Sequence, residues 1–136
     1  MSVVDGLIRI EDNGTISFGN YLLDTKSKLD NVEFNGDIYK VKTFKEITKL
    51  ERNGMFVYES VPGTTVHNFS VTDGKVEMKI EGTDDPQITL ELEPESEYKV
   101  YVDDVSIGSM KTNISGKLNL SVELGGRDSS VKIVKM

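Results

Sequence analysis

The stretch from Tyr98 to Val122 reads YKVYVDDVSIGSMKTNISGKLNLSV, and it decides the fold class. Apolar and polar residues alternate in three successive runs, which are broken at Asp103-Asp104 and at Ser115-Gly116. A period of two places successive side chains on opposite faces of a half-buried antiparallel strand. The stretch therefore predicts three consecutive strands, with no room for a helix between them.

The first half of the chain carries a repeated turn signal. Asn-Gly pairs occur at Asn13-Gly14, Asn35-Gly36 and Asn53-Gly54, each between strand-like runs. Both central residues of a type I′ turn need positive φ, which Asn tolerates and Gly adopts freely. These pairs predict a hairpin-rich sheet.

One segment leaves two interpretations open. Phe44, Ile47 and Leu50 recur every three residues, so a short helix over residues 43–52 is one interpretation. The hairpin is favoured, because Val57 would then share a face with Leu50 across the turn at residues 53–54.

A break at Val61-Pro62-Gly63 is the candidate boundary between two parts of the chain. Beyond it, short alternating runs follow one another at a spacing of roughly ten residues, which is typical of a β-sandwich. We expect an all-β protein in which a hairpin-rich N-terminal lobe, residues 1–62, packs on a seven-stranded Ig-like β-sandwich, residues 63–136.

Charge and composition exclude several classes of partner. The net charge is −7, and seven acids with no Lys or Arg lie between Glu81 and Glu97. Binding to phosphate groups needs the opposite sign, so nucleic acid and anionic membranes are not expected partners. No apolar run approaches the roughly 20 residues of a membrane-spanning helix. The N-terminus lacks a signal-peptide pattern, which predicts a cytoplasmic protein unless a leader has been removed.

No residue is assigned a catalytic, cofactor-binding or metal-binding role. His67 is the only histidine and there is no cysteine, so the usual zinc sites are not expected and a structural histidine is favoured. The loop from Arg9 to Ser17 superficially resembles a calcium loop. With Gly14 at its sixth position, however, it would have Arg9 and Asn20 where acidic ligands are needed, and a hairpin turn is preferred.

The remaining candidates are acidic and aromatic side chains. Two loop pairs could share a hard cation if their loops meet, although Asp is common in turns; they are Asp84-Asp85 and Asp103-Asp104. The run Glu91, Glu93, Glu95 and Glu97 indicates a solvated sheet face, with a basic partner as the alternative. Tyr98 and Tyr101 fall on opposite faces of their strand, so at least one is expected to be exposed. Gly125-Gly126-Arg127 is interpreted as a turn, because no helix follows it to form a phosphate loop.

Three stretches carry a family resemblance, namely DGLIRIEDNGTISFGNYLLD, ERNGMFVYESVPGTTVHNF and YKVYVDDVSIGSMKTNISGKLNLSVEL. They resemble a group of short clostridial proteins of unknown function that are sometimes labelled "endosialidase". The last stretch is also similar to C-terminal β-sandwich modules of carbohydrate-active enzymes, which implies packing and accessory roles rather than catalysis.

These observations predict a non-catalytic binding or assembly module without a cofactor. Its expected partner is a protein, including a second copy of the chain, or a glycan. The alternative is a small glycan-active hydrolase that uses a pair of carboxylates. A deep cleft with two facing acids would favour the hydrolase, and a free sheet edge would favour assembly.

Overall fold

The protein is described by a computed structural model that covers residues 3–124 and 127–136. These residues form thirteen β-strands and no helix, which confirms the all-β prediction. Consequently, this part of the chain has no helix that could span a membrane. The strands are β1 (Ile8–Ile10), β2 (Ile16–Phe18), β3 (Ser27–Phe34), β4 (Asp37–Phe44), β5 (Ile47–Arg52), β6 (Met55–Val61), β7 (Thr65–Thr72), β8 (Lys75–Glu81), β9 (Gln87–Glu91), β10 (Glu97–Val102), β11 (Val105–Lys111), β12 (Lys117–Ser121) and β13 (Ser129–Lys135).

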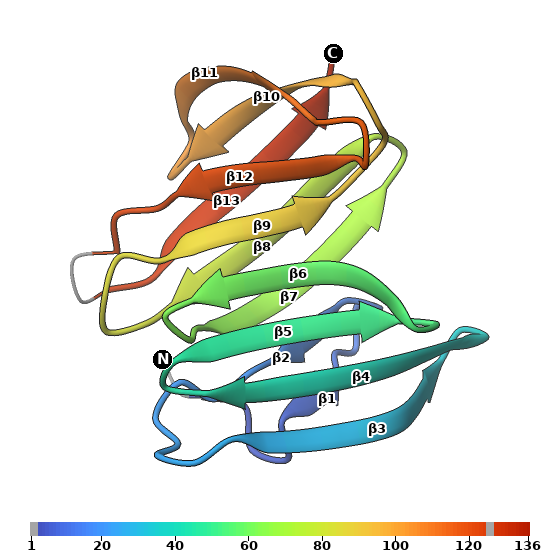
Figure 1. Cartoon of the computed structure of the whole chain (residues 1–136), viewed down its shortest axis with the longest axis vertical. Coiled ribbons are helices and arrows are strands. Elements are labelled where there is room, and N and C mark those ends of the chain that lie inside the picture. The colour runs from blue at the N-terminus through green and yellow to red at the C-terminus, as the bar shows by residue number, and fades with distance from the viewer. Residues whose placement is uncertain (1–2, 125–126) are drawn as a thin grey trace.

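The strands form two antiparallel sheets that face each other. Sheet A has seven strands in the order β1-β2-β7-β8-β13-β10-β11, and sheet B has six in the order β12-β9-β6-β5-β4-β3. In Figure 1 sheet B lies in front, with β12 at the top and β3 at the bottom, and sheet A lies behind it. Apolar and polar residues alternate along most strands, so each sheet has one apolar face. The two apolar faces pack together as in a β-sandwich.

The seven strands expected after residue 62 are all present, as β7 to β13. They divide between both sheets, and the strands of residues 1–62 extend each sheet instead of forming a separate layer. β2 pairs with β7 in sheet A, and β6 pairs with β9 in sheet B. The predicted boundary after residue 62 therefore does not separate the sheets.

All three Asn-Gly pairs lie in hairpins. Asn35 and Asn53 have φ of 51° and 52°, and each is followed by a glycine with positive φ, as a type I′ turn needs. At Asn13-Gly14 only the glycine has positive φ, so the predicted turn type is wrong there. Residues 47–52 form the strand β5, so the hairpin interpretation of this segment is confirmed. Its partner differs from the expectation: a bulge after Leu50 shifts the register, and Tyr58 rather than Val57 lies opposite Leu50.

One continuous core fills the space between the sheets. In the C-terminal half, five apolar side chains at alternating positions of β9, β10 and β12 are at most 3% exposed: Val100, Leu118, Leu120, Ile88 and Leu90. Val102 of β10 is partly buried against the same core. Phe18 of sheet A joins the two sheets, because its ring contacts Tyr58 of sheet B edge-on at a centroid distance of 5.4 Å.

A cluster of buried hydroxyl groups fixes the connection between β6 and β7. Thr64 Oγ1 lies 2.9 Å from Tyr58 Oη and 2.8 Å from Ser60 Oγ, and Thr48 Oγ1 donates to the Thr64 carbonyl at 2.7 Å. Burial raises the pKa of Tyr58 to about 12, which the hydrogen bonds from Thr64 and Ser60 only partly offset. The hydrogen bonds satisfy groups that would be costly to bury alone.

Candidate functional site

His67 lies on β7, on the face of sheet A opposite the core residue Val66. Only 7% of it is exposed, and its Nε2 is 4.0 Å from Glu81 Oε1 on β8. Among the described residues, Nε2 has no hydrogen-bond partner within normal distance. Desolvation lowers the pKa of His67, and the nearby Glu81 carboxylate opposes that shift only in part. A neutral, buried imidazole of this kind is consistent with the predicted structural histidine.

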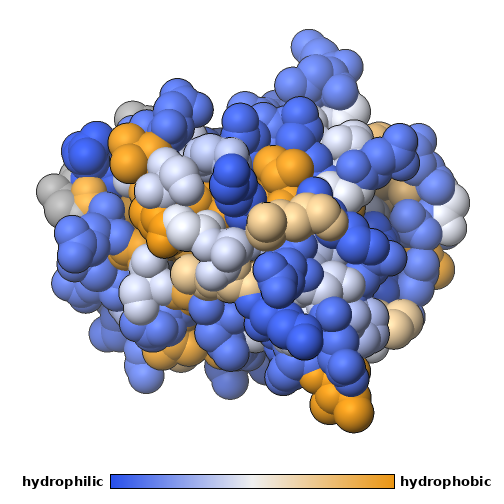
Figure 2. All heavy atoms as spheres, turned by 90° about the horizontal axis from the view of Figure 1, so that it is seen from above, coloured by the Kyte–Doolittle hydropathy of each residue, from blue (hydrophilic) through white to orange (hydrophobic). Residues whose placement is uncertain are grey.

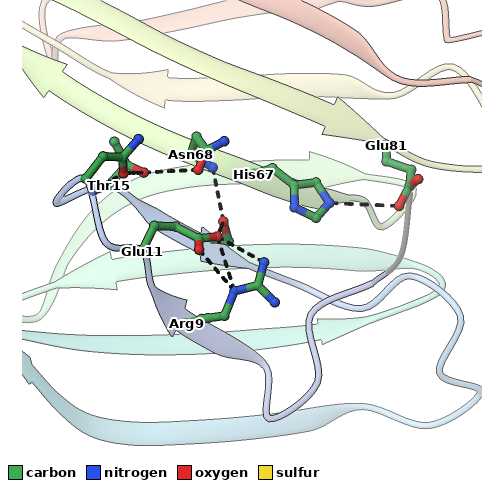
Figure 3. A network of polar contacts seen from close by, with 8 residues as sticks. Arg9, Glu11, Thr15, His67, Asn68 and Glu81 are labelled. Carbon is green, nitrogen blue, oxygen red and sulfur yellow. Dashed lines mark hydrogen bonds and ion pairs between the residues drawn. The ribbon is translucent and has the colours of Figure 1, made fainter.

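A polar network on the same face connects the β1–β2 hairpin to β7 (Figure 3). Arg9 Nη2 donates to Glu11 Oε2 at 2.9 Å, and Ser17 Oγ donates to the same carboxylate. The Asn68 backbone N–H donates to Ser17 Oγ at 3.1 Å, and Thr15 Oγ1 lies 3.2 Å from Asn68 Oδ1. The hydrogen bonds from Arg9 and Ser17 lower the pKa of Glu11, so the carboxylate stays ionised.

This network fits a structural role better than a catalytic one. Ser17 is fully buried, so its hydroxyl cannot reach a substrate. The residues weighed above as a calcium loop form the β1–β2 hairpin, where Glu11 is already bonded to Arg9 and Ser17. Nowhere in residues 3–124 and 127–136 do three or more His, Asp or Glu side chains gather in a way that could hold a metal ion.

The two aspartate pairs lie in turns and stabilise backbone. Asp85 Oδ1 accepts a hydrogen bond from the Leu124 N–H at 2.8 Å. Asp103 Oδ1 accepts one from the Ser130 N–H at 2.9 Å, and Asp103 and Asp104 both have positive φ in the β10–β11 turn. These contacts match the turn interpretation.

The acidic run lies where the alternation placed it, at the surface around the β9–β10 connection. Glu93, Glu95 and Glu97 are exposed, and Glu91 is half-buried. Glu93 Oε2 is 2.6 Å from Lys135 Nζ, so part of this charge is compensated within the chain. Of the two tyrosines, Tyr98 is buried. Tyr101 is half-buried beneath Lys132, whose Nζ is 4.9 Å from the ring centroid.

A cavity of about 590 Å³ lies at one end of the sandwich, between the two sheets. The β5–β6 and β7–β8 turns and the start of the β9–β10 connection lie at this end, on the right in Figure 1. Most of the lining is apolar or aromatic: Met55, Phe56, Val57, Phe69, Val71, Val76, Leu90, Leu92 and Tyr98. Phe69, Val76, Leu90 and Tyr98 are buried, whereas Val71 is 53% exposed and Met55, also in the lining, is 64% exposed. The cavity therefore has an apolar interior that opens to solvent past exposed apolar side chains.

Four charged residues also line the cavity, namely Arg52, Lys75, Glu91 and Glu93. Tyr98 contributes a polar atom at the inner wall, where its Oη accepts a hydrogen bond from the Glu93 N–H at 3.2 Å. Ligand sites in proteins are commonly concave, mostly apolar and provided with a few polar groups. This cavity has that composition.

A second hollow, of about 410 Å³, lies on the outer face of sheet A. Its lining is mainly polar and charged, and includes Asn13, Asn68, Lys79 and Lys132. It lacks the apolar interior of the first cavity. The inter-sheet cavity is therefore the stronger candidate for a binding site.

The sequence pattern does not predict this cavity, because three connections that are distant in the chain build it: β5–β6, β7–β8 and β9–β10. A partial signal was present: Met55 directly follows the turn at residues 53–54, and Val71 lies two residues before Asp73-Gly74, where polar residues are usual. The glycine pair Gly125-Gly126 lies outside the described residues. Comparison of the chain with protein-family models, with curated proteins and with solved structures found no match.

Proposed function

We propose that this protein is a non-catalytic binding module and that the inter-sheet cavity is its ligand site. The observation that carries the proposal is the cavity itself, about 590 Å³ of space enclosed mainly by apolar and aromatic side chains. This volume lies within the range of small-molecule sites, roughly 300–1,000 Å³.

The lining favours an amphipathic ligand. Phe56, Val57 and Leu92 are partly buried in the lining and offer apolar surface, which stabilises an apolar group by removing it from water. The exposed guanidinium of Arg52 and the half-buried Lys75 provide hydrogen-bond donors for a polar end of the same molecule. We therefore expect a small molecule with an apolar body and one polar or anionic end.

The acids of the cavity give little support to the alternative, a glycan hydrolase. Glu93 is exposed and lies 2.6 Å from Lys135, so its carboxylate is both hydrated and paired. A general acid works best when burial moves its pKa toward the working pH. Glu91 is the other acid of the lining, and it is only half-buried.

The experiment is to block the cavity and measure binding of a fluorescent apolar anion, 8-anilinonaphthalene-1-sulfonate. Val71→Trp places a large ring among the lining residues, and Ile38→Trp places the same ring at an exposed position of β4 outside the lining. Val71→Trp is expected to weaken binding at least tenfold, about 1.4 kcal/mol. Ile38→Trp should leave the affinity unchanged.

Equal affinity in both variants would show that the probe does not occupy the cavity and would overturn the proposal. Circular dichroism and a cooperative unfolding transition establish that each variant is folded. The same preparations, incubated with sialic-acid polymers and a panel of plant and bacterial glycans, should release no reducing ends. Turnover that disappears in Glu91→Gln or Glu93→Gln would instead support the hydrolase.

A further inference from the structure

The strand β11 forms one edge of sheet A. It pairs with β10 on one side, and no described strand pairs with its other side. Its sequence from Val105 to Met110 contains no charged residue, although charged residues make up 29% of the chain. Val105 and Ile107 are 64% and 46% exposed. Such an edge presents free backbone groups and apolar side chains to any strand that can align with it.

The other three edges are better protected. β1 has only three residues. The exposed face of β3 carries Lys28, Asp30 and Glu33, and a bulge interrupts its register. The strand β12 is short, with five residues, and its exposed Asn119 accepts a hydrogen bond from Thr89 of β9 at 2.7 Å. Charges, bulges and short length are the usual means by which sheet edges resist pairing.

A bulge occurs in β11 too, but it leaves the edge accessible. It falls between the pairs Val100–Gly108 and Tyr101–Ser106, so Ile107 is the extra residue. Within the strand the Gly108 N–H donates to Ser106 Oγ at 3.4 Å, a long contact that a backbone carbonyl of another strand could replace. Figure 2 looks down on this end of the sandwich, where apolar and weakly polar side chains lie among hydrophilic ones in the middle of the face.

The charges at the two ends of β11 identify the partner. Asp104 precedes the strand and Lys111 ends it, and both are exposed. Two copies of β11 in antiparallel order would bring Lys111 of each copy beside the Asp103-Asp104 turn of the other. A parallel arrangement would instead place like charges together, which is unfavourable. The strand is therefore complementary to itself in the antiparallel direction alone.

We propose that two copies of this chain associate through antiparallel pairing of β11 with β11, which joins two copies of sheet A into one continuous sheet. In this antiparallel arrangement Lys111 of each copy lies at the turn that carries Asp104 of the other copy. The interface is isologous, so each charge pair occurs twice. Backbone hydrogen bonds provide the main attraction, as in other cases of strand addition.

Sedimentation equilibrium tests this proposal with charge reversals. Lys111→Glu places two acids together at each end of the pairing, and Asp104→Lys places two lysines together. Each variant alone should dissociate at least tenfold more readily than the unchanged chain. An equimolar mixture of the two variants should restore association, because every contact between unlike variants is again between opposite charges.

A second pair of variants tests the strand itself. Ile107→Lys adds a charge to the edge and should abolish association, whereas Ile38→Lys changes a residue with the same exposure of 46% on the interior strand β4 and should not. Circular dichroism confirms that all variants are folded. A monomeric unchanged chain at high micromolar concentration would overturn the proposal. So would variants Lys111→Glu and Asp104→Lys that fail to associate when mixed although the unchanged chain is dimeric. Neither result bears on binding in the inter-sheet cavity.

Discussion

At the scale of single residues, His67 is the group whose titration can be assigned without ambiguity, because the chain has no other histidine. Desolvation lowers the pKa of His67, and the positive charge of Arg9 lowers it further. The carboxylates of Glu81, Glu11 and Asp128 raise it and offset only part of the shift. We expect an NMR titration of the imidazole to give a midpoint below the ordinary value of 6.5. The unfolded chain then binds the proton more readily, so the contribution of His67 to stability is complete above about pH 6.5 and is lost as the pH falls through the folded pKa.

The control is Glu81→Gln, which removes the attraction of the carboxylate for the imidazolium and should lower the midpoint further. As the pH falls below about 6.5, the free energy of unfolding should fall in the unchanged chain and fall less in His67→Gln. A midpoint at or above 6.5 would show that the carboxylates, not desolvation, dominate this site. Glu11 affects stability at a lower pH than His67 does. Its pKa in the folded chain is lowered, so its contribution to stability is lost only as the pH falls below 4.5, the pKa of the unfolded chain.

At the scale of elements, β12 tests how the alternating pattern is converted into packing. Leu118 and Leu120 are 2% and 3% exposed, and they lie opposite Leu90 and Ile88 of β9. Truncation of Leu120 to Ala removes buried methyl groups and leaves a cavity, so we expect the free energy of unfolding to fall by about 2 to 5 kcal/mol. Denaturant titration measures the loss.

Lys99→Ala provides the comparison, because Lys99 is exposed on the interior strand β10. Its effect should stay within about 0.5 kcal/mol, as is usual for surface positions. If Leu120→Ala lost less than about 1 kcal/mol, the side chain would have to face solvent.

At the scale of the whole molecule, both sheets contain strands from each side of residue 62, and the core between them is continuous. We therefore expect one cooperative unfolding transition, with coincident curves by circular dichroism and tyrosine fluorescence. A fragment of residues 63–136 should not fold. It would keep five strands of sheet A but only β9 and β12 of sheet B, and a sheet of two strands is marginal in water.

The full chain under the same buffer and concentration is the reference for that fragment. A fragment that showed the circular dichroism of a β protein and a cooperative transition of its own would establish residues 63–136 as an autonomous domain. Two separate transitions in the full chain would lead to the same conclusion.

The local features of this protein could be predicted from its amino-acid sequence. Alternation identified the strands and their buried faces, and Asn-Gly pairs identified the hairpins, because both depend on residues adjacent in the chain. The features that depend on which strands pair or pack together could be seen only in the folded chain. A period of two determines which face of the sheet a side chain lies on, but not which strand its own strand pairs with. The bulge beside Leu50 places Tyr58 instead of Val57 opposite Leu50, and nothing in the alternating pattern predicts this bulge. For the same reason, only the folded chain placed Glu81 beside His67 and opened a cavity between Phe69 of one sheet and Leu90 of the other.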